Sequence, residues 1–183
     1  MLEKTGLEFT TCPARIDEQQ IKESLTAEGV SPRDQSDALA EAKAKKVSIK
    51  HPEAFVLGFD QVLDLNGRCL SKPRTKSDAI AQLKYLSNQT HKLFSAAVIY
   101  EEAKPIWRFI GQASLSMRKL DDAWISSYVE RNWESIQDSV GGYKIEEEGV
   151  ILFDRIDGDH FTILGIPMTA VLSYLIQRGI LTT

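Results

Sequence analysis

Three short segments carry carboxylates and lysines in positions where these groups could act on a phosphate. Asp60 follows the apolar run 55–59, which is typical of a short buried strand, so we expect the end of a strand to hold its carboxylate. Lys72 follows a predicted hairpin, and Asp17 and Glu18 form an acidic pair in a predicted loop. Each feature has an ordinary alternative, because aspartates open turns, lysines are usually exposed and acidic pairs often cap helices. The local patterns alone leave both interpretations open.

Other kinds of chemistry have little support in the sequence. The three histidines share no ligand spacing, and there is no HExxH motif, P-loop or GxSxG segment. Cys12 and Cys69 stand alone, which favours free thiols in a reducing compartment over a disulfide framework. Chemistry in this chain would therefore rest on carboxylates, lysines and a divalent cation, a combination that suits phosphoryl chemistry.

The length and composition indicate one domain, which we place at residues 1–183. No apolar run approaches the roughly 20 residues of a membrane span, and residues 1–18 lack the apolar region of a signal peptide. The net charge of −4 offers no broad basic surface for nucleic acid. We therefore expect a cytoplasmic protein that binds neither nucleic acid nor membrane. A small anion can still bind, because a few lysines or a metal ion reverse the charge of a cleft locally.

The hydrophobic patterns predict the elements that must position these residues. Residues 39–47 are rich in strong helix formers and follow start signals at 31–34. The Asn66-Gly67 pair predicts a hairpin over 62–70, and the alternation over 107–117 predicts a long, half-buried antiparallel strand. Further predictions are helices at 77–86, 121–133 and 168–178 and strands at 92–100 and 149–156. Together they indicate an α/β fold whose helices flank a mixed, largely antiparallel, twisted sheet.

In their order and spacing, several short motifs resemble the Maf family of nucleotide pyrophosphatases over nearly the whole chain. In chain order they are Pro13-Ala14-Arg15-Ile16-Asp17-Glu18, Leu39-Ala40-Glu41-Ala42-Lys43-Ala44, Gly58-Phe59-Asp60-Gln61-Val62, Lys72-Pro73, Leu86-Ser87 with His91, Gly141-Gly142-Tyr143 with Glu146, and Ile163-Leu164-Gly165-Ile166-Pro167. Ser71 and Asn88 stand where the family has glycines. The resemblance implies the Maf fold, which is similar to that of inosine triphosphatases.

The resemblance also implies an activity and roles for four residues. The activity is hydrolysis of a nucleoside triphosphate to the monophosphate and diphosphate with Mg²⁺ or Mn²⁺, in a homodimeric enzyme that removes modified nucleotides. Asp60 would accept a proton from the attacking water, which is reasonable because a carboxylate beside a divalent cation stays ionised. Glu18 would help to hold either the metal, together with Asp60, or the attacking water. Lys43 and Lys72 would neutralise phosphate oxygens and the leaving diphosphate.

Gln61 and Glu146 bear on the choice of base. The resemblance implies that this pair marks the branch acting on 7-methyl-GTP, whereas the dTTP/UTP branch has threonine and glutamine at the two positions. A glutamate only accepts hydrogen bonds, while guanine presents two adjacent donors and carries a positive charge when methylated. An acidic run such as 146–148 would look the same in a solvated loop. Base recognition by Glu146 and a solvated loop are therefore both open.

One part of the family pattern has no counterpart in the sequence as given. The family opens with a strand and an S-x-S-x-x-R loop that binds the triphosphate, whereas residues 1–7 resemble the helix that follows this loop. Losing those donors would weaken stabilisation of the transition state. Two alternatives therefore stand beside the leading prediction: a catalytically weak or inactive, nucleotide-binding regulator of cell division, and a dTTP/UTP pyrophosphatase.

Overall fold

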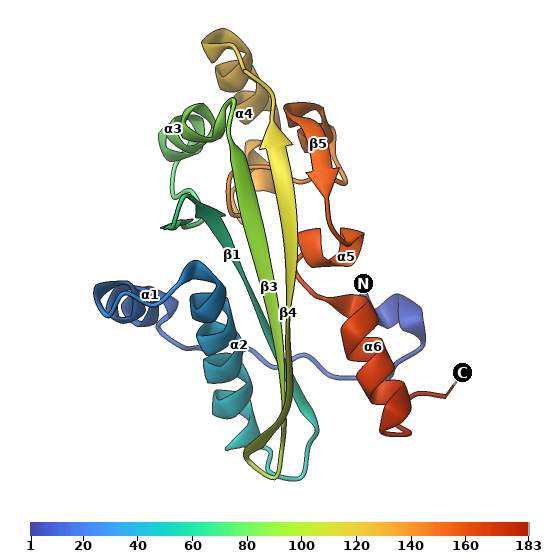
Figure 1. Ribbon diagram of the computed structural model, residues 1–183. Coiled ribbons are helices and arrows are strands. Elements are labelled where there is room, and N and C mark those ends of the chain that lie inside the picture. Colours follow the sequence, from blue (N-terminus) through green and yellow to red (C-terminus); the bar gives the residue numbers. More distant parts are fainter. Residues whose placement is uncertain (183) are drawn as a thin grey trace.

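The computed structural model describes residues 1–182, which form a five-stranded sheet flanked by helices (Figure 1). The strands are β1 (Val56–Leu65), β2 (Arg68–Leu70), β3 (Thr90–Glu101), β4 (Lys104–Met117) and β5 (Phe153–Asp157). The helices are η1 (Leu2–Thr5), α1 (Glu18–Ala27), α2 (Pro32–Ser48), α3 (Lys76–Leu86), α4 (Asp122–Ile136), η2 (Glu148–Leu152), α5 (His160–Ile163) and α6 (Met168–Gln177). The strand order is β2-β1-β3-β4-β5, and each of these pairings is antiparallel. The predicted α/β fold with a largely antiparallel sheet is confirmed.

Strand β1 is longer than predicted, and this changes the setting of Asp60. The strand was expected to end at Asp60, but Asp60 lies opposite Ala96 of β3 and the ladder continues to Asp64. The prediction was wrong because backbone hydrogen bonds to β3 do not depend on the side chain, and buried residues follow at Val62 and Leu63. Residues that pair with β3 therefore both precede and follow Asp60 in the sequence, so its backbone is fixed within the strand.

The predicted hairpin after Asp60 is confirmed. Leu65 of β1 pairs with Arg68 of β2 across the two turn residues. Both turn residues, Asn66 and Gly67, have positive φ angles of 54° and 84°. This is the backbone geometry that a two-residue hairpin of this twist requires, and it explains why Asn-Gly occupies the turn.

The segment predicted as a strand at 149–156 is only half correct. It begins as the short helix η2, and β5 starts at Phe153. Gly149 packs against the backbone of Lys144 so closely that a Cβ atom there would lie 2.4 Å from the Lys144 carbonyl oxygen. This close approach coils the chain before the strand begins. The remaining predicted helices and strands are present with shifted ends.

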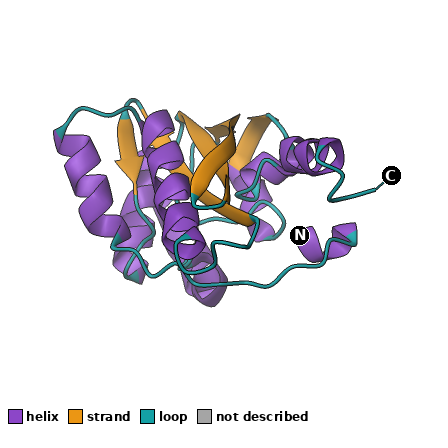
Figure 2. Cartoon of the chain, turned by 90° about the horizontal axis from the view of Figure 1, so that it is seen from below, coloured by secondary structure: helices purple, strands orange, loops and turns teal. Residues whose placement is uncertain are grey.

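Helices cover the two faces of the long strands differently (Figures 1 and 2). On one face, Ala40 and Ala44 of α2 pack against Ala96 and Val98 of β3. On the other face, α6 packs its buried apolar side chains, among them Val171, against a cluster that includes strand β3. Residues alternate along β3 between these faces, so each helix contacts its own set.

A third and larger cluster fills the end of the sheet where α3 and α4 lie (Figure 1). Leu83 of α3 and Ile125 of α4 are fully buried there together with Leu115 of β4. No helix within residues 1–182 combines the length and apolarity that a membrane crossing demands.

Candidate active site

A glycine on β1 brings helix α2 close to Asp60. A Cβ atom at Gly58 would lie 2.5 Å from the carbonyl oxygen of Ala40 and 2.6 Å from the amide nitrogen of Ala44. Only a residue without a side chain permits this approach of a helix to a strand. Gly58 and Asp60 are two residues apart and so share a face of the sheet, and the neighbouring Lys43 of α2 reaches Asp60. Its Nζ donates a 2.7 Å hydrogen bond to Asp60 Oδ1.

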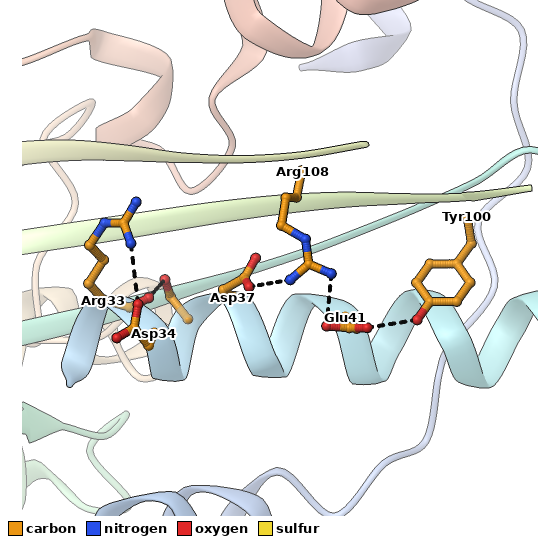
Figure 3. A network of polar contacts seen from close by, with 7 residues as sticks. Arg33, Asp34, Asp37, Glu41, Tyr100 and Arg108 are labelled. Carbon is orange, nitrogen blue, oxygen red and sulfur yellow. Dashed lines mark hydrogen bonds and ion pairs between the residues drawn. The ribbon is translucent and has the colours of Figure 1, made fainter. Parts of the chain in front are cut away.

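Helix α2 is also tied to the sheet by a polar network on its other side (Figure 3). Arg108 of β4 donates to Asp37 at 2.6 Å and to Glu41 at 3.1 Å. The hydroxyl of Tyr100 on β3 donates to the second oxygen of Glu41 at 2.9 Å. Two strands therefore hold α2 along its length, which limits where Lys43 can lie.

Helix α1 supplies the second carboxylate of the site. Asp17 caps this helix by accepting a hydrogen bond from the backbone amide of Gln20, so Glu18 is the first helical residue. Glu18 Oε1 lies 2.8 Å from Lys43 Nζ. The ammonium of Lys43 thus lies between two carboxylates, those of Glu18 and Asp60.

Burial and charge act against each other in this triad. Burial raises the pKa of the Asp60 carboxyl, and the nearby Lys43 ammonium offsets only part of this effect. Glu18 is also partly desolvated, but its hydrogen bond to Lys43 and the surrounding lysines lower its pKa overall. Desolvation opposes the charge on Lys43, yet the two carboxylates raise the pKa of Lys43. Lys43 is therefore held as a cation, and Asp60 is the more basic of the two acids.

The two oxygens of Asp60 have different surroundings. Oδ1 accepts from Lys43, whereas Oδ2 is buried and has no hydrogen-bond partner among residues 1–182. A buried carboxylate oxygen without a donor is costly for a folded protein, so its persistence needs a reason. Oδ2 is therefore the oxygen of Asp60 that lacks a donor among the described residues.

Asp60 opens onto a cavity of about 330 Å³, a size suited to a small-molecule ligand. Glu18, Lys43, Lys72 and Glu146, four residues predicted from the sequence, line this cavity. The structure thus brings together the predicted site residues, which come from positions as far apart as 18 and 146.

Lys22 is a residue that the sequence reasoning missed. It lies one helical turn after Glu18 on α1 and lines the same cavity. Its charge also lowers the pKa of both Glu18 and Asp60, although other groups contribute more. Within residues 1–182 neither Lys22 nor Lys72 forms an ion pair, whereas Lys43 forms two. The i, i+4 spacing from Glu18 was the available signal.

Gln61 lies beside Asp60 but points to the opposite face of the sheet. Its Nε2 donates to the hydroxyl of Ser95 at 2.9 Å and to the carbonyls of Thr162 and Ile163, each at 3.0 Å. The fully buried Ser95 also donates to the Thr162 carbonyl at 2.7 Å. Gln61 therefore joins β1 to α5, and its amide nitrogen is engaged within the protein. The amide oxygen is the part of this side chain left for a ligand.

The acidic run 146–148 divides into residues with different contacts. The Glu147 carboxylate accepts from Ser135 at 2.6 Å, and Glu148 accepts from Arg131 at 2.6 Å and Asn132 at 2.7 Å. Glu146 is exposed, lines the cavity and makes no side-chain hydrogen bond within the described residues. Three residues before Glu146, Tyr143 is buried in the core, where its hydroxyl and His91 share a 2.6 Å hydrogen bond. This contact fixes the segment that carries Glu146.

A metal ion at this site would have few protein ligands. Among residues 1–182 no three His, Cys, Asp or Glu side chains come together as a cluster that could hold an ion. Glu18 and Asp60 are the two carboxylates that converge on one point, the Lys43 ammonium. Mg²⁺ is commonly bound by one or two carboxylates together with substrate phosphates, and this site matches that description.

Comparison with known proteins agrees with this chemistry. A family model described as "Maf-like protein" matches residues 1–178. The "Nucleoside triphosphate pyrophosphatase" of Ruegeria pomeroyi is 55% identical over 100% of this chain and 92% of its own length. The protein of the same description from Caulobacter vibrioides is 47% identical, with 100% and 91% covered. The "7-methyl-GTP pyrophosphatase" of Rhizobium meliloti is 41% identical, with 98% and 90% covered.

Proposed function

This chain belongs to the Maf family and is a nucleoside triphosphate pyrophosphatase, and we propose that Asp60 is the general base of its reaction. The observation that carries the proposal is that Asp60 lines the cavity while its Oδ2 has no hydrogen-bond partner within residues 1–182. Oδ1 accepts from a cation, that of Lys43, so Oδ2 is the oxygen to which we assign the proton from water. The raised pKa of Asp60 makes this oxygen a stronger base than an exposed aspartate would be.

The proposed reaction is attack of water on the α-phosphorus. The water oxygen forms a bond to phosphorus while Asp60 takes its proton, and the bond from phosphorus to the bridging oxygen breaks. Diphosphate leaves with the electrons of that bond, and the nucleoside monophosphate remains. Lys22 and Lys72 line the cavity and form no ion pair with any residue that the structure describes, so their charges are available to offset that of the phosphate chain.

Glu18 and Asp60 are the residues that would hold a divalent cation, Mg²⁺ or Mn²⁺. The observation that supports this fit is that both carboxylates already converge on a single cation, that of Lys43. A bound divalent cation would neutralise phosphate charge and lower the pKa of a bound water molecule. The role of Asp60 itself is to orient the attacking water and accept its proton.

We further propose that the substrate carries a 7-methylguanine base, which Glu146 recognises. The support is that Glu146 lines the cavity with its carboxylate unengaged, while Glu147 is engaged elsewhere. A carboxylate accepts from both guanine donors and favours a cationic ring. A relative named for 7-methyl-GTP is 41% identical to this chain, which is consistent with the same specificity.

The test of the catalytic role is diphosphate release by Asp60→Asn, a change that keeps the size of the side chain and removes the base. We expect kcat to fall at least about a hundredfold. The matched control is Asp64→Asn on the same strand, whose carboxylate accepts from the Gly67 amide outside the cavity, and which should keep its activity. Full activity in Asp60→Asn would overturn the role of Asp60.

A further inference from the structure

The ammonium of Lys43 lies at the cavity between two carboxylates, a position that would also suit a bound metal cation. Its Nζ is 2.7 Å from Asp60 Oδ1 and 2.8 Å from Glu18 Oε1, so one charged nitrogen bridges the two carboxylates. Among the carboxylates that line the cavity, Glu18 and Asp60 are the two that converge on one point, and carboxylate oxygens are the ligands that Mg²⁺ and Mn²⁺ prefer. An ammonium at this point and a metal ion bound to the same two oxygens exclude each other by contact and by charge.

We propose, building on the function proposed above, that Lys43 stands in for the divalent cation in the free enzyme and gives up this place when metal and nucleotide bind. The ammonium then moves to the phosphate chain. Lys43 is suited to this exchange because its charge sits on a flexible stem of four carbons. Its side chain is 25% exposed towards the cavity, so it has a path to a new partner.

The exchange keeps the buried charge of Asp60 compensated at every stage. The Asp60 side chain is only 7% exposed, and a carboxylate this deeply buried is costly without a counter-charge. Lys43 supplies the counter-charge before the substrate arrives. Lys22 and Lys72 do not replace it in this role, because neither contacts a carboxylate within the described residues.

A consequence follows for the free enzyme. Because metal must displace Lys43, the enzyme without nucleotide should bind divalent cations weakly. Triphosphate offers Lys43 new acceptors and should therefore strengthen metal binding. Removing the ammonium should have the same effect as adding these acceptors.

The experiment measures Mn²⁺ binding without nucleotide, by the loss of the free-ion electron paramagnetic resonance signal. Four proteins are compared: the unaltered chain, Lys43→Met, Lys43→Arg and Lys22→Met. We expect Lys43→Met to bind Mn²⁺ about tenfold more tightly, and Lys43→Arg to bind as weakly as the unaltered chain. Lys22→Met removes the same charge from the same cavity but frees no carboxylate oxygen, so any gain from charge alone should appear there too. Equal affinities in Lys43→Met and Lys22→Met would overturn the proposal.

A second measurement uses the unaltered chain and so does not depend on the folding of a variant. Lysines are labelled with trinitrobenzenesulfonate in two samples, one with Mn²⁺ and one without it, both in buffer that contains no tripolyphosphate. The labelled positions are quantified by mass spectrometry. Mn²⁺ should speed the labelling of Lys43 relative to Lys22, because Lys43 loses its two carboxylate partners. An unchanged ratio would count against the exchange.

These outcomes are independent of the proposed reaction. Mn²⁺ affinity is measured without substrate, whereas the base is tested by diphosphate release in Asp60→Asn. Tighter Mn²⁺ binding in Lys43→Met would support the exchange even if Asp60→Asn kept its activity. If instead Asp60→Asn lost activity and Lys43→Met bound Mn²⁺ no more tightly than the unaltered chain, Asp60 would remain the proposed base and the exchange would be overturned.

Discussion

The backbone of Gly58 lies against the backbone of Ala44, so that a Cβ atom on the glycine would come within 2.6 Å of the alanine amide nitrogen. This contact sets the distance between α2 and β1, and thereby the position of Lys43 beside Asp60. The same helix supplies Ala44, which packs against β1, and Lys43, whose ammonium binds Asp60.

Gly58→Ala should therefore damage stability and catalysis together. Backbone atoms cannot yield as the tip of a side chain can, so α2 must shift away from β1. We expect the free energy of unfolding to fall by about 3 kcal/mol, measured by urea denaturation. The protein that remains folded should show a lower kcat, because the shift of α2 moves Lys43 away from its place at the cavity beside Asp60. Unchanged stability would show that the helix adjusts without cost.

Lys22→Gln should weaken the binding of triphosphate more than the chemical step. Lys22 lines the cavity but has no contact with Asp60, so it is expected to bind the phosphate chain in the ground state and the transition state alike. We expect KM to rise about fivefold with little change in kcat, and diphosphate to become a weaker inhibitor. Lys46→Gln, on an exposed position of α2, is the control that should match the unaltered chain. A change in kcat alone would contradict this division of roles.

Glu146→Gln should shift the choice of base. An amide presents a donor as well as an acceptor, and it carries no charge to attract a methylated guanine. We expect kcat/KM for 7-methyl-GTP to fall about tenfold relative to UTP and dTTP, since a good bidentate contact contributes roughly 1–3 kcal/mol of discrimination. Glu147→Gln is the matched control, because its carboxylate binds Ser135 instead. If both variants keep the original profile across a panel of triphosphates, Glu146 does not select the base.

His91 should make the stability of the protein depend on pH. Burial lowers the pKa of His91 from 6.5 to about 4, and the ring is only 1% exposed. Between these values the unfolded chain binds a proton that the folded protein does not, so the free energy of unfolding falls as pH falls from 6.5 towards 4. The loss from this residue alone amounts to at most about 3 kcal/mol.

The measurement is urea denaturation across this pH range for the unaltered chain and for His91→Gln. Glutamine can still bond to the Tyr143 hydroxyl but does not titrate. The variant should be less stable near neutral pH and should lose less stability on acidification. Parallel curves for the two proteins would mean that His91 takes up no proton on unfolding.

Much of the fold could be read from local patterns in the sequence. The alternation over 107–117 predicted β4, the Asn66-Gly67 pair predicted the hairpin, and the apolar spacing over 168–178 predicted α6. These features depend on neighbours a few residues apart, so the sequence contains them directly. The end of β1 was predicted wrongly because pairing with the distant strand β3 decides it, and the start of β5 because Gly149 packs against the Lys144 backbone. The acidic pair predicted in a loop is also corrected, because Asp17 caps helix α1 and Glu18 is its first residue.

The candidate site was predicted as a set of residues, and its arrangement was not. The sequence by itself determined that Glu18, Lys43 and Asp60 belong together, through the order of motifs that resemble one family. Only the tertiary structure decided that Lys43 bridges the two acids, that Lys22 lines the same cavity and that Gln61 turns away to bond α5. The physical reason is distance along the chain, because such contacts form only after the sheet has brought separate elements together.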